Sequence, residues 1–167
     1  CQQSIEDELM STAAPNYNGR RIFFVDGPAG TGKSFTFNTI LAGLRAQGKT
    51  CLAVAASGIA ATLLDNGGTV NNKLRTPFKI NAKSMCSFTT QSPYCQLFQM
   101  ADYIIWDEAP MNHKHVAECV DRTFRDMVAH IDPTSPHYKP NAHNLPFGGK
   151  VVIFGGDFRQ VLPVIKK

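Results

Sequence analysis

The stretch "VDGPAGTGKS", residues 25–34, carries three glycines, a lysine and a serine directly after the run "RIFFV" at 21–25. Its spacing fits G-x-x-x-x-G-K-[ST], a pattern in which the N–H groups of a glycine-rich loop surround phosphate oxygens and the lysine adds a fixed positive charge. We therefore predict a phosphate-binding loop, whose residues are Gly27, Pro28, Ala29, Gly30, Thr31, Gly32, Lys33 and Ser34.

The segments on either side of this loop fit the same prediction. Residues 20–26 read as a buried strand, and residues 33–48 read as a helix that Gly48 ends. A helix that starts at the loop adds its partial positive charge to the anion site, and the Ser34 hydroxyl is placed to bind a magnesium ion. The apolar face of this helix is expected to consist of Phe37, Ile40, Leu41 and Leu44.

Composition and charge limit the class of protein. With 167 residues, 43% of them hydrophobic and 18% charged, the chain suits one globular domain. The net charge of +4 permits a polyanionic partner without requiring one. Five cysteines without a C-x-x-C pair favour neither a disulfide framework nor a zinc ribbon. The chain starts with Cys1 and stops soon after a strand, so we expect a piece of a longer protein.

No run of 18 apolar residues and no signal-peptide pattern is present in the sequence. We therefore expect no membrane partner and an intracellular location. The compartment expected for the protein is the nucleus or the mitochondrion.

Strands and helices are expected to alternate along the rest of the chain. Apolar strands are predicted within 49–57, 101–110 and 150–157, and helices within 58–68 and 115–130. Residues 71–95 and 131–149 are polar or rich in proline and show no periodicity. This order predicts an α/β fold with a parallel sheet, right-handed crossovers and ligands at the carboxyl ends of the strands. The stripe expected to pack in the core on the last helix is Val116, Val120, Phe124 and Met127 or Val128.

Polar residues follow the strands at the same predicted edge as the glycine loop. Asp107 is the candidate to hold magnesium together with Ser34, and Glu108 is placed to orient or deprotonate a water molecule. Gln160, in "GGDFRQ", is placed to reach a γ-phosphate through its amide. A structural alternative is that Asp107 and Glu108 are a charge pair at a helix N-terminus, where carboxylates are favoured anyway.

Successive motifs covering nearly the whole chain resemble those of the Pif-type DNA helicases of superfamily one, including the helicase portion of Helitron transposons. The matching stretches are "FFVDGPAGTGKS", "AASGIAATLL", "IIWDEAPM", "VDRTFRDM" and "PFGGKVVIFGGDFRQVLPVI". The opening "QQSIEDELM" is similar to the segment around the family's adenine-reading glutamine, which would be Gln2, with Gln3 as the alternative.

The resemblance implies a RecA-like P-loop NTPase fold and a motor driven by ATP with Mg²⁺. Such a motor moves 5′ to 3′ along single-stranded DNA, unwinds duplexes, and is expected to serve DNA repair and recombination. Residues 1–167 resemble only the first of its two RecA-like domains, as a single ATP-binding domain. The expected partners are therefore single-stranded DNA and a second RecA-like domain of the same longer protein.

DNA contacts are also implied by the resemblance. The motif like "AASGIAA" assigns phosphate contacts to Ser57 and Gly58, with Thr69 and Asn71 helping from the next loop, although Asn71 stands where the family often has histidine. The run "NNKLRTPFKINAK" is compatible with phosphate contacts plus base stacking, or with a solvated loop whose Phe78 is tucked into the core. Its basic residues are Lys73, Arg75, Lys79 and Lys83.

Two rival functions remain open on the sequence. One rival is another P-loop enzyme. A GTPase would show N-K-x-D for guanine recognition, but "NNKLR" has Arg75 at the aspartate position. A small-molecule kinase would be expected to show an arginine-bearing lid, but the loop at 131–149 has no arginine. The other rival is a module that binds ATP and DNA without useful turnover.

Arg159 is the arginine closest in sequence to the motifs. We expect it to orient the Gln160 loop or to pair with Asp157, with direct action on the nucleotide as the alternative. Because a cationic finger from a partner domain is worth about a thousandfold in rate, the chain alone is expected to bind ATP but to hydrolyse it only marginally.

Overall fold

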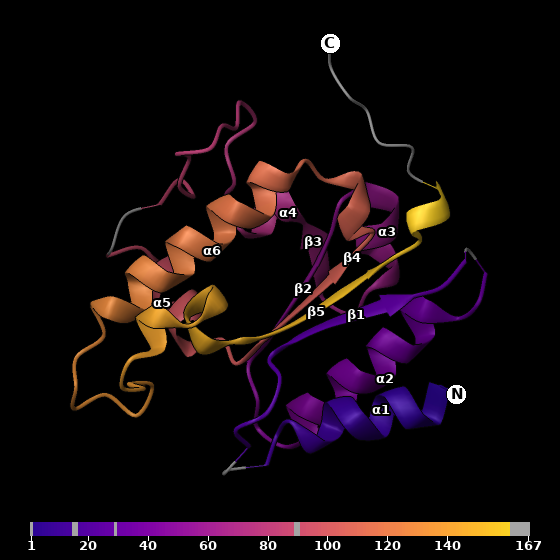
Figure 1. Cartoon of the computed structure of the whole chain (residues 1–167), viewed down its shortest axis with the longest axis horizontal. Coiled ribbons are helices and arrows are strands. Elements are labelled where there is room, and N and C mark those ends of the chain that lie inside the picture. The colour runs from indigo at the N-terminus through magenta and orange to yellow at the C-terminus, as the bar shows by residue number, and fades with distance from the viewer. Residues whose placement is uncertain (1, 15–16, 29, 89–90, 161–167) are drawn as a thin grey trace.

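A parallel β-sheet organises the computed structural model, which describes residues 2–14, 17–28, 30–88 and 91–160. The described residues form five strands in the order β1-β5-β4-β2-β3, with every neighbouring pair parallel (Figure 1). The strands are β1 (Ile22–Asp26), β2 (Cys51–Ala55), β3 (Gly67–Thr69), β4 (Tyr103–Asp107) and β5 (Val151–Gly156). The predicted α/β fold with a parallel sheet is confirmed.

Helices cover both faces of the sheet. On one face lie α1 (Gln2–Ser11), α2 (Lys33–Ala46) and α3 (Gly58–Leu63). On the other face lie α4 (Val70–Lys73), α5 (Pro93–Met100) and α6 (Lys114–Ala129). Short 3₁₀ turns complete the connections, namely η1 (Ala109–Met111), η2 (Ala142–Asn144), η3 (Pro146–Gly149) and η4 (Phe158–Gln160). None of the described helices is both long and apolar enough to cross a membrane.

Alternation along the central strands explains why the sheet has two covered faces. Successive strand residues point to opposite faces, so Ile104 of β4 packs in the core beneath α6 while its neighbour Ile105 packs in the core beneath α2. Both side chains are fully buried, and each such burial contributes about 1.5–3 kcal/mol. The register of the sheet is thereby fixed. The connecting loops lie along two sides of the sheet, the carboxyl edge where the strands end and the amino edge where they begin.

The helical stripes predicted from the sequence are confirmed. The four apolar residues of α2 are buried against the sheet, and the helix ends before Gly48, whose φ of 75° requires the left-handed region. The stripe of α6 is buried on the other face, including both Met127 and Val128. These residues are therefore core.

The sequence patterns did not predict α1, α4, α5 or β3, and for β3 and α5 the reason can be identified. The glycines expected to end α3 instead form β3, and a Cβ on Gly67 would lie 2.3 Å from the Ala61 carbonyl oxygen, so only glycine lets this strand pass α3. Pro93, which lies in the segment 71–95 predicted to show no periodicity, is the first residue of α5 after the Ser92 N-cap, where proline is favoured.

The strand before the glycine loop is less buried than predicted. Within the described residues β1 pairs only with β5, and Ile22 and Phe24 are 42% and 40% exposed. The prediction of a strand is correct, but the prediction that it is buried is wrong, because β1 is an outermost strand of the described sheet.

Candidate active site at the carboxyl edge of the sheet

Three loops meet where the strands end. Asp26 at the end of β1 is in register with Gly156 of β5, and Asp107 at the end of β4 is in register with Ala55 of β2. The Gly27 N–H donates to the Gly156 carbonyl at 3.2 Å. The glycine loop, the β4 carboxylates and the segment after β5 therefore share one edge, as the strand order requires for a parallel sheet.

The glycine loop has the backbone that its sequence demands. Gly30 and Gly32 have φ values of 78° and 86°, which residues with a side chain rarely adopt. The Lys33 ammonium lies inside the loop, where it donates to the Pro28 carbonyl at 3.0 Å and also to the Gly27 carbonyl. Ser34 follows in the first turn of α2. Ala29 lies outside the described residues.

A cavity of about 230 Å³ adjoins the loop, and α1 forms its far wall through Ile5. Lys33 and Thr31 line the side nearest the loop. Gln2 begins α1, although its side chain lies outside the described residues, while the Gln3 amide donates to the Asp7 carboxylate at 3.4 Å on the helix surface.

The two acidic residues after β4 lie in a desolvated environment beside a lysine. Asp107 is 3% exposed, and its Oδ1 accepts the Glu108 N–H at 2.8 Å. Burial raises the pKa of the Asp107 carboxyl, whereas this hydrogen bond and Lys33 act to lower it. Burial and the charge of Asp107 raise the pKa of Glu108, again opposed by Lys33. A cation bound between these groups would relieve the cost of keeping both ionised.

The backbone at Glu108 disfavours a purely structural role for the pair. Glu108 has a φ of 52°, a left-handed conformation that is strained for a residue with a side chain and is often retained at functional sites. The turn that follows, η1, has only three residues, and α6 begins later with His113 as its N-cap. The pair therefore does not sit at the N-terminus of an α-helix.

Oxygen donors at this edge suit a hard cation. Asp107 supplies a carboxylate and Ser34 a hydroxyl, which are the ligand types that Mg²⁺ prefers alongside phosphate oxygens. The donor chemistry fits the predicted magnesium ion.

The segment after β5 is tied to the ends of two strands by Arg159. Its backbone N–H and its Nε each donate to Asp157 Oδ1 at 2.9 Å, and its Nη2 lies 3.7 Å from Asp26 Oδ2. The hydrogen bond from Arg159 lowers the pKa of Asp157. The expected pairing of Arg159 with Asp157 is present. Gln160 ends η4 and is exposed, with its N–H bonded to the Asp157 carbonyl at 3.2 Å.

Sequence reasoning missed the roles of Asp26 and the aromatic surface beside it. Asp26 ends β1 just as Asp107 ends β4. Because ligands are expected at the carboxyl ends of parallel strands, Asp26 could have been predicted as a site residue. Phe24 stacks on Phe158 with ring centroids 4.6 Å apart, and the two line an apolar cavity of about 260 Å³ together with Trp106. These rings come from three separate segments, which no sequence pattern joins.

Four DNA-contact candidates lie at the same edge and help to hold local structure. Ser57 Oγ accepts the Ala60 N–H at 3.2 Å and Thr69 Oγ1 accepts the Asn72 N–H at 3.3 Å, which makes them the N-caps of α3 and α4. Each hydroxyl still has a proton to donate. The Asn71 amide donates to the Thr76 carbonyl at 3.2 Å. The remaining candidate, Gly58, begins α3.

The basic loop divides into held and free residues. The Lys73 ammonium donates to the Asn66 carbonyl, and Arg75 lies over the Tyr94 ring at 4.2 Å from its centroid and donates to its hydroxyl. Phe78 is 91% exposed, which rules out the alternative in which it is tucked into the core. The lysines at 79 and 83 are exposed as well. The loop therefore offers an exposed aromatic ring followed in sequence by two exposed lysines.

Comparison with known proteins identifies relatives of one kind. A family model described as PIF1-like helicase matches residues 1–167. The ATP-dependent DNA helicase PIF4 of Trypanosoma brucei brucei is 31% identical over 144 residues, which cover 83% of this chain and 16% of that protein. The ATP-dependent DNA helicase Pif1 of a Psychrobacter species is 28% identical over 143 residues, covering 84% of this chain and 20% of that protein.

Solved structures agree with the described fold. Bacteroides Pif1 bound to ssDNA has a TM-score of 0.72 at 25% identity, and the match covers 99% of this chain and 33% of that chain. Pif1 from Bacteroides in complex with ADP-AlF3 and ssDNA gives the same values. The chain therefore spans about a third of the solved relatives and a fifth or less of the curated ones. The family model, the strand order and the glycine loop together place this chain in the PIF1-like helicase family.

Proposed function

We propose that the chain is the nucleotide-binding motor domain of an ATP-dependent 5′ to 3′ DNA helicase. The observation that carries the proposal is the convergence, at one edge of the sheet, of the glycine loop, the Asp107 and Glu108 carboxylates and the Gln160 turn. A helicase motor needs these parts together, because it couples ATP hydrolysis to movement on a strand.

Each residue at this edge has a distinct proposed role in nucleotide chemistry. Lys33 and the loop N–H groups bind the β- and γ-phosphates, and Ser34 with Asp107 holds magnesium, which neutralises charge on those phosphates when bound. Glu108 orients the attacking water and accepts its proton, a task that its raised pKa suits. Gln160 contacts the γ-phosphate, and Gln2 on α1 reads the adenine.

Single-stranded DNA is the proposed second ligand. Ser57, Gly58, Thr69 and Asn71 present hydroxyls, amides and backbone groups at the ends of β2 and β3, which suits contacts that do not depend on sequence. The exposed Phe78 beside Lys79 offers a stacking surface next to phosphate-binding cations. The solved Bacteroides Pif1 structures that contain ssDNA support this assignment.

We infer a second RecA-like domain in the longer protein as the partner that completes the site. Arg159 is held by Asp157 and Asp26, so reaching the nucleotide would require it to leave both carboxylates. A cation from a second domain then supplies the missing charge stabilisation. The same observation favours the second candidate function, in which the chain alone binds ATP and DNA with little turnover.

Measuring ATP hydrolysis with and without single-stranded DNA, in this chain and in the longer protein, tests the proposal. We expect marginal turnover from the chain and a DNA-stimulated rate at least about a thousandfold higher with the second domain present. Fast, DNA-stimulated hydrolysis by the chain alone would overturn the two-domain mechanism and assign the catalytic cation to Arg159. No DNA stimulation in the longer protein would reject the helicase motor.

A further inference from the structure

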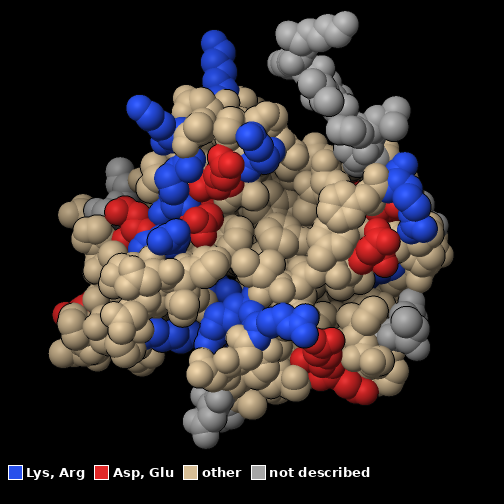
Figure 2. All heavy atoms as spheres, viewed as in Figure 1, with Lys and Arg blue, Asp and Glu red and all other residues tan. Residues whose placement is uncertain are grey.

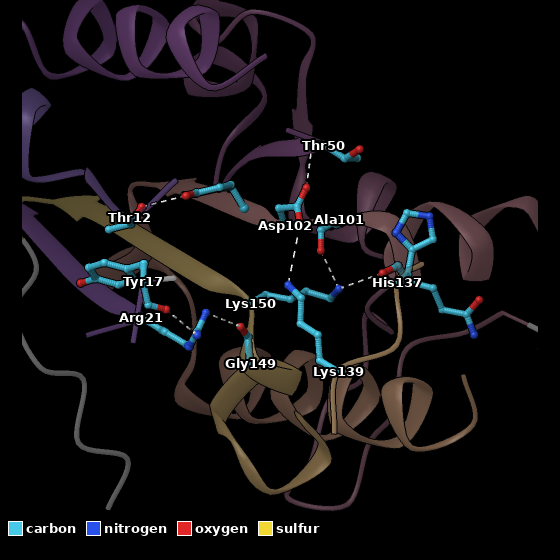
Figure 3. Close-up of polar contacts among 12 residues, drawn as sticks. Thr12, Tyr17, Arg21, Thr50, Ala101, Asp102, His137, Lys139, Gly149 and Lys150 are labelled. Atoms are coloured by element: carbon cyan, nitrogen blue, oxygen red, sulfur yellow. Dashed lines mark hydrogen bonds and ion pairs between the residues drawn. The ribbon is translucent and has the colours of Figure 1, made fainter. Parts of the chain in front are cut away.

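Charged residues also gather at the opposite edge of the sheet, where the strands begin. Arg21 directly precedes β1, Asp102 precedes β4 and Lys150 precedes β5. Because parallel strands begin at one edge, these residues converge, and Lys139 joins them from the loop before β5 (Figure 3). None of them belongs to the proposed nucleotide site.

Lys150 is the most deeply buried charge of this group. It is 5% exposed, and its ammonium donates to the carbonyls of Ala101 at 2.6 Å and Gln99 at 3.3 Å, at the C-terminus of α5. The partial negative charge of a helix C-terminus favours a cation there. Lys150 is therefore held in place beneath this edge by two backbone carbonyls.

Negative charge at this edge is scarce. Asp102 accepts the Thr50 N–H through Oδ2 at 3.1 Å and lies 3.9 Å from the Lys139 ammonium through Oδ1. Arg21 donates to two backbone carbonyls, those of Tyr17 at 3.3 Å and Gly149 at 3.2 Å, and its described contacts include no carboxylate.

Two neighbouring cavities open among these groups. The larger, of about 380 Å³, is lined by Arg21, Lys49 and Lys139, and the smaller, of about 50 Å³, by Lys139 and Lys150. Asp102 is the one carboxylate among the described residues that line either cavity. Figure 2 shows Lys and Arg atoms gathered across the lower centre of the molecule, on the side where the strands begin.

We propose that the larger cavity binds a phosphate group through Arg21, Lys49 and Lys139. Guanidinium and ammonium groups donate strong, charge-assisted hydrogen bonds to phosphate, and a doubly charged phosphate balances the cations that Asp102 leaves uncompensated. The volume of about 380 Å³ admits a small phosphorylated molecule or a nucleotide of a bound strand. This proposal does not depend on the proposed helicase activity.

The electrostatics of Lys150 agree with this assignment. Burial lowers the pKa of Lys150 to about 7, and the Lys139 charge acts in the same direction while Asp102 opposes it. A phosphate beside Lys139 would restore the ordinary preference of Lys150 for its charged form.

Calorimetric titration with inorganic pyrophosphate tests the site, in a Lys33→Ala background that removes the lysine of the glycine loop. We expect binding that weakens by at least about tenfold in Lys49→Gln/Lys139→Gln, because two charged donors are lost. Lys114→Gln, an exposed lysine on α6, is the control and should change affinity by less than about twofold.

An isosteric substitution of Asp102 should change pyrophosphate affinity in the opposite direction. Tighter binding cannot result from loss of the fold, so this variant excludes unfolding as the explanation. Asp102→Asn keeps an acceptor for the Thr50 N–H but removes the negative charge, so pyrophosphate should bind more tightly, by about threefold or more. Circular dichroism checks the fold of each variant. In the chain that keeps Lys33, Lys49→Gln/Lys139→Gln should lower the number of bound pyrophosphate molecules by one. Equal binding by that double variant and Lys114→Gln, or weaker binding by Asp102→Asn, would overturn the proposal.

A short oligothymidylate distinguishes the two sources of the phosphate. If its binding falls in Lys49→Gln/Lys139→Gln as pyrophosphate binding does, the site takes the backbone of a strand. If only pyrophosphate binding falls, the site takes a free phosphorylated molecule. If neither ligand depends on these lysines, there is no phosphate site at this edge.

Discussion

The two edges of the sheet carry opposite charge. At the carboxyl edge, Asp26, Asp107, Glu108 and Asp157 outnumber Lys33 and Arg159 among the described residues that this structure brings together. At the amino edge, Arg21, Lys49, Lys139 and Lys150 surround Asp102.

This difference decides what each edge can bind unaided. A phosphate at the acid-rich carboxyl edge needs a metal cation with it, since otherwise Asp107 and Glu108 would repel it. A phosphate at the amino edge needs no metal, because lysine and arginine side chains already supply the charge. Binding at the first edge should therefore depend on magnesium and binding at the second should not.

The largest effect that would break this comparison belongs to Glu108. Glu108→Gln removes the proposed base but keeps the size of the side chain, so ATP hydrolysis in the longer protein should fall by about 10² to 10⁴ while nucleotide affinity is retained. Single-turnover hydrolysis and equilibrium binding measure the two quantities separately. Normal hydrolysis would reject Glu108 as the base.

Lys33→Ala should show the next largest effect. One charged group with hydrogen bonds to phosphate is lost, so ATP affinity in the presence of magnesium should weaken by about a hundredfold. Calorimetric titration measures it, and Lys114→Ala is the matched control. An unchanged affinity would remove the glycine loop from the proposed nucleotide site.

The carboxyl edge was predictable because its motifs have fixed spacing within single segments. The left-handed glycines, the lysine and the acidic pair follow their strands directly, so local sequence and the parallel-sheet rule place them together. The same rule places Arg21, Asp102 and Lys150 together at the other edge, yet nothing in the sequence marks a residue that precedes a strand as functional.

Other features depend on tertiary contacts that no local pattern encodes. Tyr94 holds Arg75 from nineteen positions away, and Phe158 stacks on Phe24 from the far end of the chain. The exposure of β1 depends on its place in the strand order, which sequence periodicity does not report. The sequence therefore predicted the elements and the loop chemistry better than the side chains that connect them.

The pH dependence of stability sharpens the comparison at the amino edge. The pKa of Lys150 falls to about 7 in the folded chain, so between that pH and its ordinary value of 10.5 the unfolded state binds more protons. Stability should therefore rise with pH in this window, by about 2 kcal/mol from pH 7 to 9. In Lys150→Met this contribution should vanish.

Urea unfolding of both proteins at several pH values measures this difference. The raised pKa values of Cys51 and Cys86 have the opposite effect on stability but are common to both proteins, so they cancel in the comparison. If the free energy of unfolding has the same pH dependence in the parent and in Lys150→Met, the lowered pKa of Lys150 is contradicted.

The smallest expected effect concerns the basic loop. Lys79 and Lys83 are exposed, whereas Lys73 is held by the Asn66 carbonyl, so Lys79→Ala/Lys83→Ala should weaken single-stranded DNA binding more than Lys73→Ala. We expect the affinity for single-stranded DNA to fall by about three- to tenfold, alike for all sequences. The slope of log K against log salt concentration should become shallower by about 1.4, because two phosphate contacts disappear. Phe78→Ala should weaken affinity with the salt slope unchanged, since stacking releases no counterions. Affinity measured at several salt concentrations separates these outcomes; if the double variant keeps the parent's slope, the loop is a solvated surface and the DNA path must run elsewhere along the carboxyl edge.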